Sequence, residues 1–162
     1  MVTNPNPELA LVREILRGVP LFTDLTTPEL ELFVALGRVV SCSKGTSFFS
    51  EGDKGSGLFV IISGSVRITK SGLAGHADTI GVIGKGACFG EMALIDDLPR
   101  SATATAEDEC LVLETDRDDA IDLFQENPYI ARKVLWAFCR SLSLRLREAG
   151  DRIVFLSAPR PA

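Results

Sequence analysis

The sequence predicts a mainly β protein with flanking α-helices: an antiparallel β-roll of the jelly-roll or double-stranded β-helix type, with short helices before it and a long helix after it. Two observations predict this class. Between Val39 and Leu113, short β-branched or aromatic stretches alternate with glycine turns, as in rolls, barrels and sandwiches. On both sides of this segment, apolar residues recur at the helical period. The chain has 162 residues, of which 46% are hydrophobic, so it can form one domain with its own core.

The first element is a pair of short helices within residues 1–37. Each begins with a capping side chain followed by a proline, at Asn6-Pro7 and at Thr27-Pro28. We expect helices at 7–17 and 28–36, because a glycine follows each of them.

The second element is the roll itself, expected at residues 38–115. Stretches rich in β-branched and aromatic residues are the strand candidates. They are Ser47–Phe49, Leu58–Ile62, Ser65–Thr69, Thr79–Ile83, Thr103–Ala106 and Leu111–Leu113.

The third element is a pair of helices within residues 116–156, expected to act as a lid and as a dimer helix. The helical period returns at 118–125, and Asn127-Pro128 marks the start of the long second helix. Gly150 lowers helix propensity by about 1 kcal/mol relative to alanine, so a kink or an early end is allowed there. The last residues, 157–162, are expected to form a flexible tail.

The long helix has an apolar seam in which spacings of four and three residues alternate. Its members are Leu135, Cys139, Leu142, Leu146, Ala149, Ile153 and Leu156. Such a seam needs a packing partner. We favour the same helix of a second subunit, which would make the protein a homodimer; the alternative is that the seam packs on the domain's own roll.

Composition and charge exclude several classes of function. The net charge is −5 and the pI is near 4.9, although residues 129–162 hold seven basic and only two acidic side chains. That basic segment favours a solvated helix face over a nucleic-acid contact, because the whole chain is acidic. The longest apolar runs are too short to cross a membrane. The first twenty residues lack the features of a secretion signal, so we expect a cytoplasmic protein.

Metal sites and catalysis are also disfavoured. The four cysteines are 46, 22 and 29 positions apart, and His76 is the single histidine. We therefore expect reduced, mostly packed thiols and no metal site. Asp96-Asp97 has no suitable base other than His76, and the glycines from Gly84 to Gly90 do not have dinucleotide-binding spacing. The protein is not expected to be an enzyme.

The most informative segment is the cassette at residues 86–106, GACFGEMALIDDLPRSATATA. Gly90 lets a ligand approach closely, and Glu91 opens a short helical turn and can accept a hydrogen bond from a hydroxyl group. Pro99 fixes the approach of Arg100, whose guanidinium can bind two phosphate oxygens. Ser101 adds a hydroxyl and a backbone N–H. These residue types predict a pocket for a sugar phosphate.

The stretch FGEMALIDDLPRSAT resembles the phosphate-binding cassette of cyclic nucleotide-binding domains, the family shared by regulatory subunits of cyclic-AMP-dependent protein kinase and bacterial catabolite activator proteins. GVPLFTDLTTPELELFVAL resembles the helices that precede the family's roll, and EGDKGSGLFVIISGSVRIT resembles its strand–turn–strand signature. The resemblance covers about residues 16–156.

The resemblance implies a role for each residue of the cassette. It implies that Glu91 binds the ribose 2′-hydroxyl and that Arg100 binds the cyclic phosphate. Backbone groups of Gly90, Ala93 and Ser101 would complete the cradle.

The apolar side chains of the turn and the purine contact are less clearly assigned. Met92 is counted with the site, although its side chain, like those of Leu94 and Ile95, is expected to pack against the roll. In the catabolite activator relatives the long helix supplies small hydroxyl side chains to the purine, whereas this chain reads Leu144-Arg145-Leu146-Arg147. We choose Arg147 for a cation–π contact with the purine, against the alternative of a solvated helix face.

The function expected from the resemblance is that of a receptor whose ligand is a cyclic nucleotide and which needs no other cofactor. Cyclic AMP is favoured over cyclic GMP, although a hydroxyl at Ser101 can serve the phosphate in one case and guanine in the other. Family transcription factors continue into a helix-turn-helix domain, whereas this sequence ends at Ala162. We therefore expect a stand-alone receptor without direct DNA binding, which signals to an unidentified protein partner by moving its C-terminal helix. The alternatives are an interaction module that binds no nucleotide, and a fragment of a larger transcription regulator.

Overall fold

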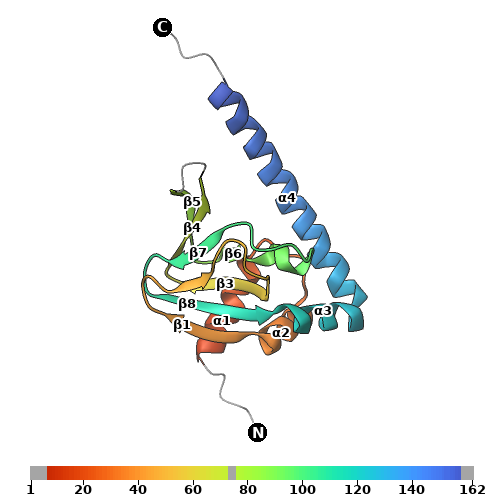
Figure 1. Ribbon diagram of the computed structural model, residues 1–162. Coiled ribbons are helices and arrows are strands. Elements are labelled where there is room, and N and C mark those ends of the chain that lie inside the picture. Colours follow the sequence, from red (N-terminus) through yellow and green to blue (C-terminus); the bar gives the residue numbers. More distant parts are fainter. Residues whose placement is uncertain (1–6, 73–75, 158–162) are drawn as a thin grey trace.

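The computed structural model describes residues 7–72 and 76–157. In this part of the chain, eight antiparallel strands form two four-stranded sheets, flanked by four α-helices. The expected fold class, a mainly β protein built on an antiparallel roll, is confirmed (Figure 1). The helices are α1 (Pro7–Gly18), α2 (Thr27–Leu36), α3 (Arg117–Glu126) and α4 (Pro128–Ser157), and a 3₁₀ turn, η1, spans Glu91–Leu94. The strands are β1 (Arg38–Cys42), β2 (Ser47–Phe49), β3 (Gly57–Ser63), β4 (Ser65–Ser71), β5 (Ala77–Gly84), β6 (Cys88–Phe89), β7 (Thr103–Ala106) and β8 (Cys110–Asp116).

The two sheets have the strand orders β1-β8-β3-β6 and β2-β7-β4-β5. Strand β3 is buried from Gly57 to Ile62, because its two faces serve two different cores. Leu58, Val60 and Ile62 pack toward the helices. Phe59 and Ile61 instead belong to the core between the sheets, where the rings of Phe59 and Phe89 stack with centroids 5.1 Å apart. Apolar burial on both faces of one strand explains its nearly continuous hydrophobic sequence.

The structure contains two strands, β1 and β6, that the sequence did not predict. β1 pairs with β8 along its full length, from Arg38↔Glu114 to Cys42↔Cys110. None of its residues is buried, so its sequence lacks a clear apolar alternation. β6 has only two residues, too few for any periodic pattern. β2 and β7 have the predicted bounds, and the other predicted strands lie within longer observed ones.

The helix starts are largely as expected, with one correction. The cap of α2 is Thr26 and not Thr27, because the Thr26 backbone N–H donates to the Glu29 carboxylate at 2.7 Å. This is one arm of a capping box, which places Pro28 one position deeper in the helix. The expected cap Asn6 lies outside the described residues. Asn127 ends α3, and its carbonyl accepts the first backbone hydrogen bond of α4 from Ala131.

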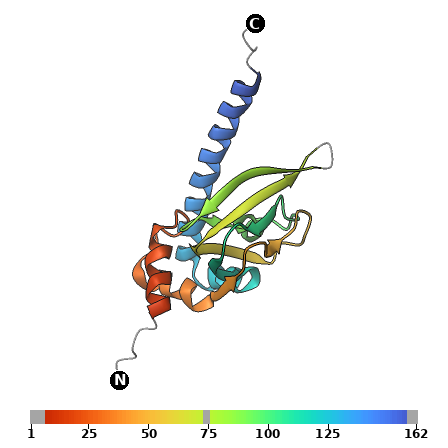
Figure 2. The same cartoon turned by 90° about the vertical axis from the view of Figure 1, so that its left-hand side faces the viewer.

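Helix α4 continues through Gly150 without a break. Only its first part is buried, through Ile130, Val134, Ala137 and Phe138. The rest of the helix projects on the same side as the β4–β5 hairpin, away from α1 and α2 (Figures 1 and 2). No described helix is long and apolar enough to cross a membrane.

The seam of α4 is exposed. Its described members, from Leu135 through Cys139, Leu142, Leu146 and Ala149 to Ile153, all have exposed side chains, and the side chain of Leu156 lies outside the described residues. The alternative that the seam packs on the domain's own roll is therefore wrong for these residues. The expected tail at 158–162 also lies outside the described residues.

All four cysteines are unbridged. Cys110 is buried, Cys42 and Cys88 are half-buried, and Cys139 is exposed. Three of the four thiols are thus at least partly packed, and the side chain of Cys139 is not.

Candidate functional site

The cassette begins with a left-handed residue, Gly90, at φ 74° between β6 and η1. A Cβ atom at this position would lie 2.8 Å from Arg100 Nη1 and 3.1 Å from the Gly57 carbonyl oxygen. Glycine is therefore required twice, by its backbone conformation and by the close approach of Arg100. The site depends on the absence of a side chain here.

Arg100 is the buried cation of the cassette, with only 7% of its surface exposed. Its Nη1 donates to the Gly90 carbonyl at 2.8 Å and its Nη2 to the Gly57 carbonyl at 2.9 Å. The guanidinium also lies 4.0 Å from the centre of the Phe49 ring. Burial lowers the pKa of Arg100, and this is opposed by the negative charges of Glu91 and Asp53.

One nitrogen atom of the Arg100 guanidinium is unpaired. Its buried Nε has no hydrogen-bond partner among the described residues. A buried, unpaired donor is costly unless something binds it. The cassette therefore combines a fixed positive charge with an unused donor, which is the chemistry of an anion site.

Glu91 is the buried anion of the cassette, also 7% exposed. Its Oε1 accepts a hydrogen bond from Nη1 of Arg145 at 2.6 Å. Arg145 comes from α4, 54 residues further along the chain. The ion pair joins the cassette directly to the long C-terminal helix.

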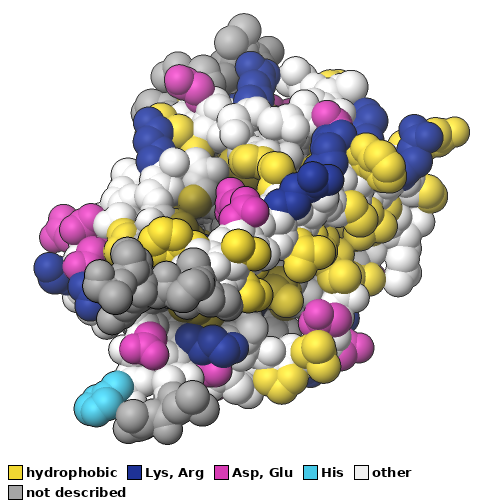
Figure 3. All heavy atoms as spheres, turned by 90° about the horizontal axis from the view of Figure 1, so that it is seen from above, with side chains coloured by type: hydrophobic (Ala, Val, Ile, Leu, Met, Phe, Trp, Pro, Cys, Tyr) yellow, Lys and Arg dark blue, Asp and Glu magenta, His cyan; other side chains and the backbone are white. Residues whose placement is uncertain are grey.

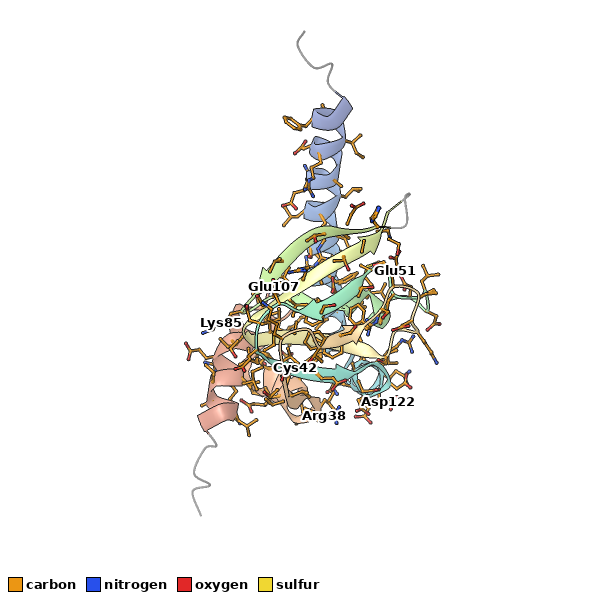
Figure 4. The ribbon with its side chains drawn as sticks, turned by 60° about the vertical axis from the view of Figure 1, so that its left-hand side comes forward. Arg38, Cys42, Glu51, Lys85, Glu107 and Asp122 are labelled. Carbon is orange, nitrogen blue, oxygen red and sulfur yellow. The ribbon has the colours of Figure 1, made fainter. Side chains whose placement is uncertain are left out.

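Glu91 and Arg145 line a hollow of about 360 Å³. It lies between the segment after α1, the turn from β5 to β6, and α4. Its walls include Val19, Leu21, Ile83, Ala87 and Phe138, with Lys85 and Ser141 as further polar groups. Figure 4 shows Lys85 beside α1, on the opposite side of the roll from Glu51. Glu91 lines this hollow, whereas Arg100 does not.

The remaining cassette residues have mixed positions. Ala93 is buried, whereas Ser101 is exposed and its carbonyl accepts a hydrogen bond from Lys70 at 2.8 Å. The expectation that Met92 and Ile95 pack against the roll is wrong, because their side chains are 41% and 46% exposed. Leu94 does pack against the core, as expected. Within residues 7–72 and 76–157, no group of acidic, histidine or cysteine side chains could hold a metal ion.

The sequence pointed to Arg147 on the long helix, and the structure places Arg145 at the hollow instead. Arg147 is exposed and is not part of the hollow's wall. The helical period explains the difference, because two positions along a helix turn the side chain by about 200°. The buried residues Val134 and Phe138, followed by Ser141 and Arg145, recur at spacings of four, three and four residues. In the folded domain Arg145 continues this stripe, whereas Arg147 lies on another face of the helix.

Comparison of the sequence with models of known protein families shows which family the chain belongs to. Residues 39–127, more than half of the chain, match the family model described as the cyclic nucleotide-binding domain. The chain belongs to this family. The match includes the whole of the cassette at residues 86–106.

Individual relatives agree with this assignment. The domain is 33% identical over 142 residues to the cyclic AMP receptor protein of Thermus thermophilus, covering 88% of this chain and 64% of the relative. It is 32% identical over 103 residues to the cAMP-dependent protein kinase regulatory subunit of Yarrowia lipolytica, covering 64% of this chain and 27% of the relative. The chain thus spans less than two thirds of the length of these curated relatives.

Solved structures show the same fold. A cyclic nucleotide-binding domain from Methylobacillus flagellatus superposes with a TM-score of 0.81 at 28% identity, covering 96% of this chain and 88% of that one. The catabolite activator protein of Thermus thermophilus gives a TM-score of 0.75 at 33% identity, covering 85% of this chain and 63% of that one.

Proposed function

We propose that this domain is a regulatory receptor that binds a cyclic nucleotide, with cyclic AMP favoured over cyclic GMP. The observation that carries the proposal is Arg100, a buried arginine with an unpaired Nε next to the left-handed Gly90. In the proposed complex Arg100 binds the cyclic phosphate with backbone groups of Gly90, Ala93 and Ser101, and Glu91 binds the ribose 2′-hydroxyl. The purine then lies toward the hollow that begins at Glu91. The relatives named for cyclic AMP support the choice of nucleotide.

Isothermal titration calorimetry with cyclic AMP and cyclic GMP tests this proposal. We expect binding by the parent protein and a loss of about 100-fold or more in Arg100→Ala, because two charge-assisted hydrogen bonds to phosphate disappear. Arg38→Ala is the control, since it removes an exposed arginine that pairs with Glu114 on the outside of the roll. Binding should also stabilise the fold by about 2.7 kcal/mol at 100 times the dissociation constant. Absence of binding to folded protein would contradict the proposal and favour the interaction-module alternative.

We further propose that nucleotide binding acts on α4 and that the output is the position of this helix. The Glu91–Arg145 ion pair supports this proposal, because a ribose hydroxyl at Glu91 competes with a side chain of α4. A bound nucleotide then shifts the equilibrium toward the position of α4 in which it makes the more favourable contacts. Hydrogen exchange with and without nucleotide should differ across residues 128–155. Identical protection in the two samples would refute this switch while leaving binding intact.

We also propose that the protein forms a homodimer through the exposed seam of α4. We propose separately that the domain binds its ligand without catalysing a reaction. The alternating spacing and the exposure of Leu142 and Leu146 support the dimer. A regulated protein partner and a cytoplasmic location stay predictions of the sequence.

A further inference from the structure

Arg117 is a second arginine that contacts the cassette, from outside the motif that identified the site. It is the first residue of α3, at the end of β8, and its side chain is 24% exposed. Its Nε donates to the Ala93 carbonyl at 2.7 Å, and its Nη2 donates to Asp97 Oδ1 at 2.6 Å. One guanidinium therefore holds both the 3₁₀ turn and the loop that follows it.

The backbone of Arg117 makes a third connection. Its N–H donates to the Ser56 carbonyl at 2.9 Å, directly before β3. The adjacent carbonyl, that of Gly57, accepts from Arg100 Nη2. Two arginines thus bind neighbouring carbonyls at the start of one strand.

The same two arginines also hold the two ends of η1. Arg100 binds the Gly90 carbonyl before the turn, and Arg117 binds the Ala93 carbonyl within it. Of the backbone groups expected in the phosphate cradle, the Ala93 N–H lies between these two contacts. Planar guanidinium groups fix orientation as well as charge, so such a frame limits the conformations of the turn.

We propose that Arg117 is a positioning residue for nucleotide binding: it ties the cassette to the first turn of α3, so that the phosphate cradle is formed before the ligand arrives. This inference rests on the proposed function. Arg117 acts through the carbonyl of Ala93 and the carboxylate of Asp97 and not on the ligand itself. Its benefit is entropic, since a preformed site does not need to be ordered on binding.

Calorimetry on Arg117→Ala, Arg117→Lys and Asp97→Asn measures the contribution to binding. We expect the dissociation constant for cyclic AMP to rise about tenfold in Arg117→Ala, and less in Arg117→Lys, which keeps the charge but not the fork. In a double-mutant cycle, Asp97→Asn should add little once Arg117 is alanine. Arg38→Ala, which also removes an arginine–carboxylate pair, should bind like the parent. Parent-like binding by folded Arg117→Ala would overturn the inference.

Hydrogen exchange without nucleotide gives a readout that a purely structural role would not produce. In Arg117→Ala the amides of residues 91–97 should exchange faster, while those of β3 and α1 keep their protection. A uniform rise across the domain would mean that Arg117 supports only global stability, and no change at 91–97 would also overturn the inference. If the parent protein binds no nucleotide, the proposed function fails, and the exchange data still decide whether Arg117 orders the cassette.

Discussion

The ion pair between Glu91 and Arg145 is the most consequential contact at the residue scale. The Glu91 side chain is 9% exposed, whereas that of Arg145 is 55% exposed. A carboxylate this buried needs a partner, and α4 supplies it. The carboxylate expected to bind ribose is thus already engaged by a residue of the proposed output helix.

Replacement of Arg145 should therefore destabilise the protein, even in the absence of nucleotide. We expect Arg145→Ala to cost about 1 kcal/mol, because it leaves the Glu91 carboxylate buried without its cation. For a chain of this length that is a fall in melting temperature of roughly 2–4 °C. Arg147→Ala is the matched control and should leave the melting temperature unchanged, since Arg147 is exposed. Thermal unfolding of both variants by circular dichroism is the measurement.

The same pair of variants examines the sequence-based choice of Arg147. If Arg147 stacks on the purine, Arg147→Ala weakens nucleotide binding in calorimetry although its stability is normal. An unstable Arg147→Ala, or a parent-like Arg145→Ala, would contradict the assignment of the Glu91 contact to Arg145.

Which site residues can be predicted from the sequence depends on how far apart they lie along the chain. Gly90, Glu91 and Arg100 lie within eleven consecutive residues, so their local pattern marks the cassette without knowledge of the fold. Arg117 and Arg145 reach the same cassette from distant elements, and only the tertiary structure brings them there. Their sequence neighbourhoods carry no motif for this contact.

At the scale of elements, the start of α2 and the first part of α4 are joined by one carboxylate. Glu29 accepts from the backbone of Thr26 at 2.7 Å, and the Lys133 ammonium donates to both of its oxygens, at 2.8 and 2.6 Å. The Lys133 hydrogen bond and the Thr26 N–H lower the pKa of Glu29 from 4.5 to about 2. One side chain therefore caps one helix and holds another.

This shift makes the stability of the α2–α4 contact depend on pH. Because the pKa of Glu29 is lower in the folded state, its contribution is complete above about pH 4.5 and is lost as the pH falls toward 2. We expect Glu29→Gln to lower the urea midpoint at pH 7, and the gap from the parent to close between pH 4.5 and pH 2. Urea titrations at pH 7, 5, 4 and 3 measure this gap. A gap that stayed constant at low pH would show that Glu29 acts through packing and not through its charge.

The strands show where local pattern loses its predictive power at this scale. β3, β7 and β8 bury alternating or continuous apolar residues and were visible in the sequence. β1 has no buried residue and β6 has two residues, so neither produces a pattern. Both are strands because a neighbour offers hydrogen bonds, β8 to β1 and β3 to β6. That cause lies in the assembled sheet and not in the strand's own sequence.

At the scale of the whole molecule, one helix, α4, exposes several large hydrophobic side chains. Large hydrophobic side chains along α4 are exposed, including Leu144 at 62%, Leu146 at 75% and Phe155 at 82%. From above, apolar side chains form a broad band across the face, with Lys and Arg side chains beside it (Figure 3). Continuous apolar surface of this kind marks an interaction site in soluble proteins.

The homodimer proposal predicts which of these side chains matter. Leu142 and Leu146 are members of the seam, whereas Leu144 lies between them on another face of the helix. A carboxylate in the seam would have to be buried without a partner on dimerisation, at a cost of several kcal/mol. We therefore expect Leu142→Glu and Leu146→Glu to abolish the dimer. Leu144→Glu, with the same change of side chain on the same helix, should leave the dimer intact.

Sedimentation at tens of micromolar of the parent and the three variants is the measurement, with circular dichroism as the check that α4 stays helical. A parent protein with the mass of a monomer would refute the dimer at once. Equal dissociation by all three variants would mean that added charge, and not the seam, disrupts assembly. Selective dissociation by the two seam variants would link the alternating spacing in the sequence to the assembly, because Leu144→Glu places the same side chain on another face of the same helix.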